Sequence, residues 1–334
     1  VPYTTNGTET EVTFTVVGTV DGTDYTIKKT VNVASKYKQF EKLTLDKLNT
    51  SFTENKTFQD PKGNIITVPT GFKIVSTNDT NSNTNAVPTV DQGIVIEDVT
   101  SGATAGSQFV WVPVGTITKA DGTKTEIKLN RYKFASDGTP TAKNEEIIDS
   151  YYSETASKGN TVAKSISDFK SSVAANGGYY IGRYEARKNT TSGKLTEVNS
   201  DSVWNNITQQ DAATQARNMY DEQQPFTSDL MNSYAWDTAI TFIQKCTDKT
   251  NYANQPSLNK SFLSTGTTND NPCNIFDMAS NVYEWTTETS GYSDYPCVAR
   301  GGDYYYSYGC TSYRRYSSTS NYGLVFGFRP LLYL

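Results

Sequence analysis

Three short blocks near the carboxyl end decide the fold: residues 274–285 read NIFDMASNVYEW, residues 300–302 read RGG, and residues 327–330 read GFRP. Each block sets a charged residue beside aromatic residues or glycines, and these charges are Glu284, Arg300 and Arg329. Aromatic side chains are mostly buried, whereas a buried charge without a partner is costly. We therefore expect Trp285 and Phe328 in the core, and the three charged residues in buried hydrogen-bonded pairs.

In this order, the blocks resemble the signature of the formylglycine-generating-enzyme type of C-type lectin fold. Two upstream blocks, FVWVPV at 109–114 and YYIGRYE at 179–185, resemble the opening strands of the same family. The resemblance implies an α+β, C-type lectin-like (sulfatase-modifying type) domain. The scaffold residues that it implies are Glu284, Trp285, Arg300, Gly301, Gly302, Gly327, Phe328 and Arg329.

The residues at the family's catalytic positions do not support its activity. Enzymes of this family oxidise a substrate cysteine with two reactive cysteines, and those positions are Tyr306 and Thr311 in this chain. Cys310 lies one residue away and has no partner in register, so the required thiolate pair is missing. We therefore predict a protein that is not an enzyme and has no cofactor. The alternative is a divergent enzyme that acts through Tyr306, Cys310 or Asp303.

Composition excludes several other classes of function. The 334 residues contain no histidine, which removes imidazole bases and imidazole metal ligands. The net charge of -5 without a basic run argues against nucleic acid as a partner. No apolar stretch reaches the roughly 18 residues of a membrane span, and no C-x-x-C or EF-hand pattern predicts a metal. The many Thr, Ser, Asn and Tyr residues indicate an extracellular protein.

A tyrosine-rich segment stands where the family has its active site. Residues 303–323 read DYYYSYGCTSYRRYSSTSNYG, with 7 tyrosines, 5 serines and no aliphatic residue. Tyrosine and serine mixtures are typical of antibody paratopes, because tyrosine offers a large amphipathic contact area at low entropic cost. The predicted ligand contacts are Tyr304, Tyr305, Tyr306, Ser307, Tyr308, Cys310, Ser312, Tyr313, Arg315, Tyr316, Ser317, Ser318, Ser320, Asn321 and Tyr322.

Every residue type in this segment can be reached from an asparagine codon by changing only its adenines. Adenine-directed mutagenesis is the mark of diversity-generating retroelements, and the chain resembles their variable proteins, many of which display a hypervariable region on this lectin fold. The resemblance implies a surface adhesin of a bacterium or a receptor-binding protein of a phage virion. The ligand would be a protein or a glycan on a cell surface. The alternative is a structural surface domain without a ligand.

Two neighbouring arginines in the segment and three tyrosines outside it have more than one possible role. Arg314 and Arg315 are each compatible with a carboxylate of the scaffold or with a ligand. Tyr283, Tyr292 and Tyr295 are candidates to extend the surface, and Tyr283 is equally compatible with the core. Of the four cysteines, Cys273 and Cys297 are expected to form a disulfide around the intervening loop, which leaves Cys246 and Cys310 single.

The amino-terminal part differs in pattern from the rest. Residues 1–34 alternate with period two around an Asp21-Gly22 turn, which predicts a β-hairpin with a buried face. Because so few strands are not stable alone, we favour the end of an immunoglobulin-like sandwich over a ribbon packed on the next domain. We expect a linker over 35–60 and the lectin-like domain over 61–334, with its variable region at about 303–323. Within the domain we predict helices at 165–175, 208–220 and 233–246, and strands at 65–68, 72–75, 93–96, 109–112 and 127–129.

Overall fold

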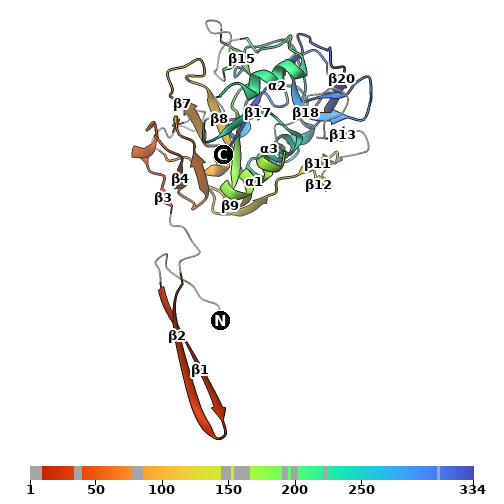
Figure 1. Cartoon of the computed structure of the whole chain (residues 1–334). Helices are drawn as coiled ribbons and strands as arrows, with labels where there is room; N and C mark the ends of the chain where they lie inside the picture. The colour runs from red at the N-terminus through yellow and green to blue at the C-terminus, as the bar shows by residue number, and fades with distance from the viewer. Residues whose placement is uncertain are drawn as a thin grey trace. The chain divides into compact units, whose positions relative to one another are not determined.

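The computed structural model (Figure 1) describes residues 10–33, 40–76, 86–143, 152–153, 166–189, 195–196, 202–220, 224–306 and 309–334. The chain divides into two compact units, Val1–Glu41 and Lys42–Leu334. The fold is of the α+β class, with many short strands and three α-helices in the described part. Within these ranges, no helix has both the length and the apolar character that crossing a membrane requires.

The smaller unit contains the predicted hairpin. Strands β1 (Thr10–Val20) and β2 (Thr23–Val33) pair antiparallel in continuous register, with Val16 opposite Ile27. Asp21 and Gly22 both have positive φ, as a two-residue hairpin turn requires. The expected buried face is not seen among the described side chains, because Val16 and Ile27 are exposed. The immunoglobulin-like assignment stays a prediction.

A six-stranded antiparallel sheet lies at the centre of the larger unit, in the order β17-β22-β14-β8-β7-β6. Most residues of the four inner strands are buried, as in a sheet covered on both faces. The bounds in this order are Thr227–Leu230, Pro330–Tyr333, Gly178–Gly182, Gln108–Pro113, Val95–Asp98 and Phe72–Ile74. The terminal GFRP block therefore leads into a central strand beside the YYIG block.

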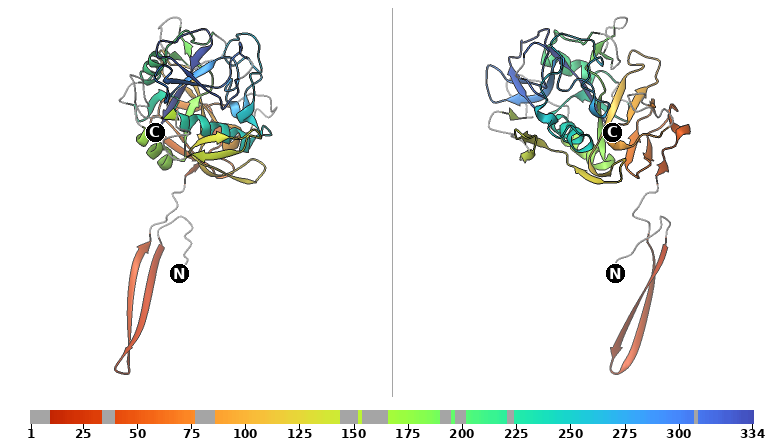
Figure 2. Two further views of the ribbon diagram at one scale, coloured as in Figure 1. Left: turned by 90° about the vertical axis from the view of Figure 1, so that its right-hand side faces the viewer. Right: turned by 180° about the vertical axis from the view of Figure 1, so that it is seen from behind.

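A second sheet carries the other sequence blocks. Its order is β13-β18-β19-β20, and β21 pairs in parallel with β18. The bounds are Tyr152–Ser153, Tyr283–Ser290, Cys297–Arg300, Arg314–Ser317 and, for β21, Phe326–Phe328. The labelled strands β18 and β20 lie close together in Figure 1, and the same blue strands stay together in the two views of Figure 2. This sheet brings the VYEW, RGG and GFR blocks side by side.

Short ribbons complete the strand set. One three-stranded sheet has the order β3-β4-β5, and β9/β10, β11/β12 and β15/β16 form pairs. Their bounds are Glu41–Lys42, Lys56–Gln59, Ile65–Val68, Gly115–Thr118, Lys124–Ile127, Arg131–Phe134, Pro140–Lys143, Arg187–Lys188 and Leu195–Thr196. The strand expected at 127–129 ends at Ile127, and the one expected at 93–96 begins at Val95 because Gly93 is left-handed.

The three predicted helices are confirmed. Helix α1 (Ile166–Asn176) ends at Gly177, whose positive φ closes the last turn. Helix α2 (Gln209–Arg217) begins with the Thr208 hydroxyl accepting from the Asp211 amide at 3.1 Å. Helix α3 (Ser233–Cys246) is capped by Asn232 and buried along most of its length. The described ranges also contain four 3₁₀ turns, η1 to η4, at Leu45–Lys47, Val90–Gln92, Tyr252–Asn254 and Pro272–Asn274.

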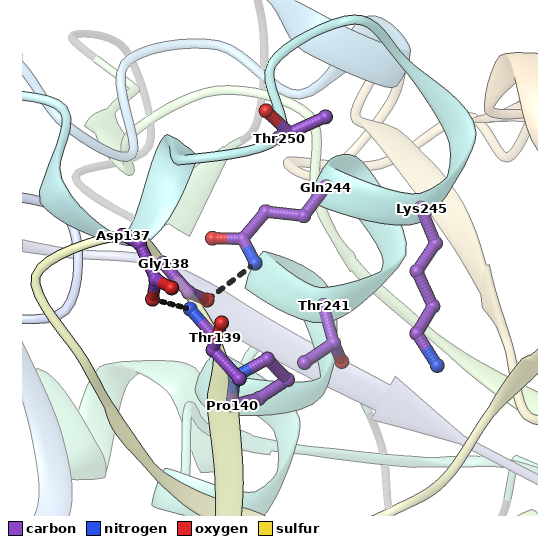
Figure 3. Close-up of a pocket in the computed structure, with 8 residues that line it drawn as sticks. All are labelled: Asp137, Gly138, Thr139, Pro140, Thr241, Gln244, Lys245 and Thr250. Atoms are coloured by element: carbon purple, nitrogen blue, oxygen red, sulfur yellow. Dashed lines mark hydrogen bonds between the residues drawn. The ribbon is translucent and has the colours of Figure 1, made fainter.

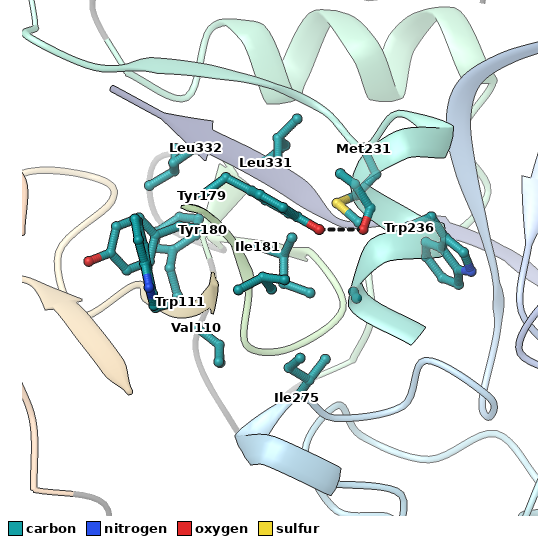
Figure 4. Packing of buried hydrophobic residues seen from close by; sticks show 14 of the residues in the cluster. Val110, Trp111, Tyr179, Tyr180, Ile181, Met231, Trp236, Ile275, Leu331 and Leu332 are labelled. Carbon is teal, nitrogen blue, oxygen red and sulfur yellow. Dashed lines mark hydrogen bonds between the residues drawn. The ribbon is translucent and has the colours of Figure 1, made fainter. Parts of the chain in front are cut away.

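One continuous apolar core fills the larger unit. Figure 4 shows Trp111, Tyr179 and Tyr180 packed beside Leu331 and Leu332, and the Tyr179 hydroxyl donates to the Ala235 carbonyl of α3. Leu43, Leu48 and Phe58 also belong to this core. The stretch 43–60 is therefore part of the larger unit rather than a linker.

The expected disulfide is not formed. Cys273 is a free thiol whose Sγ lies 3.6 Å from the Asp91 carbonyl oxygen, and burial raises its pKa well above the usual value. Cys297 sits in β19 opposite Ser317 and Thr289. The two cysteines pack on different neighbours, Cys273 against the Gly93 turn and Cys297 in the second sheet, so they do not close the intervening loop.

Candidate ligand-binding surface

The Glu284–Arg329 pair anchors the strands beneath the tyrosine-rich segment. Arg329 donates to both oxygens of Glu284, at 3.0 and 2.6 Å, and also to the Gly182 and Phe276 carbonyls at 2.8 and 2.6 Å. Both side chains are buried. Burial raises the pKa of Glu284, and the guanidinium beside it opposes that rise. The predicted buried pairing of these two residues is thus present.

Arg300 has different partners from those expected. Its guanidinium forms ion pairs with Asp237 at 2.5 Å and with Glu288 at 3.2 Å. Arg300 lies opposite Glu284 in the pairing of β19 with β18, but its guanidinium binds these other two carboxylates. Arg314 bridges the same two carboxylates, at 2.6 and 2.9 Å, and Arg131 reaches Glu288 at 2.8 Å. We call these five residues the ionic network. It joins α3, β11, β18, β19 and β20.

The charges of the ionic network stabilise one another. Burial alone would raise the pKa of Glu288, but Arg314, Arg300 and Arg131 lower it to about 2. Burial would likewise lower the pKa of Arg314, and the two carboxylates, on Asp237 and Glu288, raise it instead. Arg314 is therefore fixed to the scaffold, which settles one of the two arginines left open by the sequence.

Gly301 and Gly302 allow the close approach of two chain segments. A Cβ on Gly301 would lie 2.7 Å from the Met278 carbonyl oxygen, and one on Gly302 would lie 2.6 Å from that of Ala279. Gly301 also has a φ of 83°. A Cβ on Gly327 would meet Val282 at 2.8 Å. Glycine is thus required at these three scaffold positions for steric or backbone reasons that do not involve a ligand.

The predicted contact residues fall into three groups by exposure. Tyr305, Tyr316 and Tyr322 are exposed, at 71%, 45% and 65%, and Ser320 is exposed as well. The half-buried group comprises Tyr304, Tyr306, Cys310, Ser312, Tyr313, Arg315, Ser318 and Asn321. Ser317 is buried and accepts a hydrogen bond from the Asn321 amide, so the expectation that it faces a ligand is wrong. Ser307 and Tyr308 lie outside the described residues.

Of the three tyrosines outside the segment, Tyr283 is buried in the core, whereas Tyr292 and Tyr295 join Tyr316 at the surface. The ring centroids of Tyr292 and Tyr295 lie 5.1 and 6.1 Å from that of Tyr316, and the two rings are 41% and 51% exposed. We call these three residues the tyrosine platform. The Ser290 hydroxyl fixes the loop that carries the first two, since it accepts from the Tyr292 amide and donates to the Tyr295 carbonyl.

Aromatic contacts also order the start of the segment. Tyr304 packs on Phe262 at 5.6 Å, and Tyr305 meets Tyr306 edge to face at 4.9 Å. The Arg315 guanidinium lies over the rings of Tyr283 and Tyr306 at 4.9 and 5.1 Å. Arg315 is thus half-buried among aromatic rings rather than extended toward solvent.

Sequence reasoning missed several residues of the surface and its support. Asp237 and Glu288 lie outside the sequence motifs. Asp237 could have been found as a carboxylate within the apolar stripe of a core helix, and Glu288 as a carboxylate in a buried strand. Phe262 gave no signal. Leu324 follows two residues after Tyr322 and is exposed, but it falls one residue beyond the aliphatic-free segment.

Two cavities lie away from this surface. One of about 310 Å³ lies between the turn before β12 and the end of α3, and Figure 3 shows Gln244 and Lys245 at its wall. Another of about 260 Å³ is lined by Phe72, Tyr220 and Phe226, among others. Neither is lined by a residue of 303–323. The tyrosine surface is therefore separate from both cavities.

No protein-family model matches the chain, and no curated protein is significantly similar to it. Two solved structures show a weak likeness to it. PvdO from Pseudomonas aeruginosa shares 12% identity at a TM-score of 0.38, over 69% of this chain and 95% of its own. CarF shares 13% identity at a TM-score of 0.34, over 67% and 97%. Both TM-scores are below 0.5, so neither likeness assigns a family to this chain.

Proposed function

We propose that the chain is a diversified ligand-binding protein that uses the surface around Tyr305, the tyrosine platform and Tyr322. The observation that carries the proposal is the exposure of these large aromatic rings, among which Tyr316 lies on β20, a strand that the buried ionic network holds in place. Exposed tyrosines on a rigid support favour binding, because little conformational entropy is lost on contact. The contacts within the tyrosine platform also favour binding, because clustered exposed rings are typical of interaction sites.

The composition of 303–323 supports diversification by adenine-directed mutagenesis of the kind that retroelements carry out. Residue types reachable from asparagine codons fill the segment, while the surrounding scaffold uses types that are not so restricted. A C-type lectin-like scaffold of the formylglycine-generating-enzyme type fits this role. The setting would be extracellular, on a bacterial surface or a phage virion, with a protein or glycan of a cell surface as the ligand.

Binding is favoured over the divergent enzyme by the surroundings of the candidate groups. The Asp303 side chain is buried and accepts from the Tyr306 amide at 3.0 Å, which is a structural contact. The Cys310 thiol lies 3.8 Å from the Ser312 hydroxyl, which is a weak hydrogen-bonding partner and not a base. Neither arrangement supplies an activated nucleophile.

A comparison of matched variants tests the proposal. The triple variant Tyr305→Ala/Tyr316→Ala/Tyr322→Ala is compared with Tyr25→Ala, which removes a tyrosine of intermediate exposure among these three from the hairpin. Both proteins are applied to arrays of immobilised bacterial surface glycans and purified outer-surface proteins. We expect the triple variant to lose at least tenfold in affinity for whichever array member wild type binds, and Tyr25→Ala to keep it. Equal binding by both variants, or no binding by wild type, would contradict the proposal.

A further inference from the structure

The β1–β2 hairpin has an apolar face that stays exposed in the described part of the chain. Directly opposite residues of an antiparallel pair point to the same face, so Val16 and its partner Ile27 share a face with Val20 and Tyr25. All four side chains are more than half exposed. A two-stranded ribbon is at best marginally stable in water, whereas three or more strands with an apolar face form a stable sheet. The hairpin therefore needs a partner.

The outer edge of β2 is open to such a partner. Among the described residues, β2 pairs with β1 and with no other strand. Its 11 residues, Thr23–Val33, include no proline, and its register with β1 is continuous, so no bulge turns the edge away. Long, regular edges without these protections are templates for pairing with another chain.

The charges on β2 match those of a second β2 strand. Asp24 and Lys28 are exposed on the polar face, where Lys28 lies opposite Thr15 of β1 rather than a carboxylate. The two residues lie at equal distances from Thr26 along the strand. When a second β2 pairs antiparallel about Thr26, Asp24 of each copy therefore lies opposite Lys28 of the other. The strand is thus complementary in charge to itself.

This register also matches the neutral side chains. Thr26 lies opposite Thr26 of the second copy, and Tyr25 lies opposite Ile27 on the apolar face. Pairs of threonines, of opposite charges, and of an aromatic with a β-branched residue are favourable across antiparallel strands. The register with the longest overlap, centred on Lys28, instead places two lysines opposite each other, which is destabilising. The side chains therefore select the register centred on Thr26.

We infer that two copies of the chain associate through β2 and form a four-stranded antiparallel sheet, in the order β1-β2-β2-β1, with its register centred on Thr26. The contact uses the same surface on both copies, so it closes as a two-fold dimer. Strand β1 contains no lysine or arginine and so offers no equivalent charge match at the outer edges. The dimer carries two copies of the tyrosine platform, which strengthens attachment to a surface with many ligands. This last consequence rests on the proposed function, whereas the pairing does not.

Charge reversal tests the pairing in the full chain, by sedimentation velocity over a range of concentrations in low-salt buffer. Wild type should sediment as a species of twice the 36.9 kDa of one chain. Asp24→Lys and Lys28→Asp each place like charges opposite one another at two points of the interface, and each should weaken dimerisation at least tenfold. The double variant Asp24→Lys/Lys28→Asp restores opposite charges at both points and should recover the dimer.

Lys133→Asp is the matched control, because it reverses an exposed strand lysine in β11 of the larger unit. It should dimerise like wild type, and so should Tyr25→Ala, which keeps both charge pairs. A monomeric wild type, an assembly larger than two copies, undiminished dimerisation in both single variants, or a double variant that stays monomeric would overturn the inference. Because the experiment uses no ligand, the dimer can fail while the proposed function stands, and a dimer that binds no array member rejects the function alone.

Discussion

A single arginine, Arg329, closes four hydrogen bonds in the interior of the protein. Two go to Glu284 and two to backbone carbonyls of segments distant in the sequence. A buried ion pair adds little net stability compared with apolar residues of the same size, because desolvation offsets the attraction. Removing Arg329 alone is strongly destabilising, because the Glu284 carboxylate then stays buried without its partner.

We therefore predict that Arg329→Met lowers the free energy of unfolding by about 3–5 kcal/mol, measured by urea denaturation at pH 7. The matched control is Lys128→Met, because Lys128 pairs with Glu126 at the surface, where both side chains are more than half exposed. That change should cost less than about 1 kcal/mol. A similar cost for the two variants would show that Arg329 does not anchor the core.

Glu288 makes the stability of the fold depend on pH in the acidic range. Its pKa in the folded protein is about 2, against an ordinary value of 4.5, because three arginines surround it. A depressed pKa stabilises the folded state fully above 4.5, and this contribution is lost as the pH falls from 4.5 toward 2. The shift corresponds to a contribution on the order of 3 kcal/mol.

Glu288→Gln should therefore be clearly less stable than wild type at pH 7, and the difference should narrow as the pH falls below 4.5. Urea denaturation at pH 7, 4 and 2.5 measures this. Glu54→Gln changes a side chain that is 73% exposed and serves as the control. Its free energy of unfolding should differ little from that of wild type at any of the three pH values. A difference between Glu288→Gln and wild type that stays constant with pH would contradict the assigned role of the ionic network.

At the scale of elements, the RGG block shows how a loop and a strand are brought into contact. Gly302 follows β19 and crosses the carbonyl of Ala279 so closely that a single methyl group does not fit. This close approach places the start of the tyrosine-rich segment beside the residues that precede β18, where the Tyr304 amide donates to the Asn281 carbonyl at 2.9 Å.

We expect Gly302→Ala to lower the free energy of unfolding by about 1–3 kcal/mol through this clash. The control is Gly102→Ala, at a site where an added Cβ meets nothing within 4 Å. That variant should be neutral or slightly stabilising, since alanine reduces the entropy of the unfolded chain. Thermal unfolding followed by circular dichroism distinguishes the two, and equal midpoints would refute the steric argument.

The elements also show what a sequence can and cannot predict. Helix α3 was predictable because its apolar stripe has helical spacing, and α2 because Thr208 and Asp211 form its cap. The ionic network was not predictable, since Asp237 and Glu288 lie 51 residues apart and no local pattern pairs them. The disulfide prediction failed for the same reason, because flanking two paired strands does not bring Cys273 to Cys297.

Within the tyrosine-rich segment, composition predicted a surface but not which side chains reach it. Ser317 and Ser318 are identical in sequence terms, and only the pairing of β20 with β19 makes one buried and the other half-buried. Exposure of Tyr305 and Tyr322 followed the prediction, whereas Arg315 packs over aromatic rings from two other elements.

At the scale of the whole molecule, the two units differ in how they are stabilised. The described core residues all lie between Leu43 and the carboxyl end, and the hairpin contributes none of them. We predict that a chain of residues 42–334 folds on its own, with a thermal midpoint within about 2 °C of that of the full chain. Loss of cooperative unfolding on removal of residues 1–41 would show that the hairpin is part of the larger unit.

The central claim is that a rigid scaffold presents a surface that is diversified at chosen positions. Its most direct test is deep sequencing of the gene across a population, with each codon compared to any near-identical repeat nearby. The account predicts changes only within codons 303–323, only where the repeat carries adenine, and concentrated at the exposed positions Tyr305, Tyr316, Thr319, Ser320 and Tyr322. An invariant segment, or changes unrelated to adenines in the repeat, would contradict it.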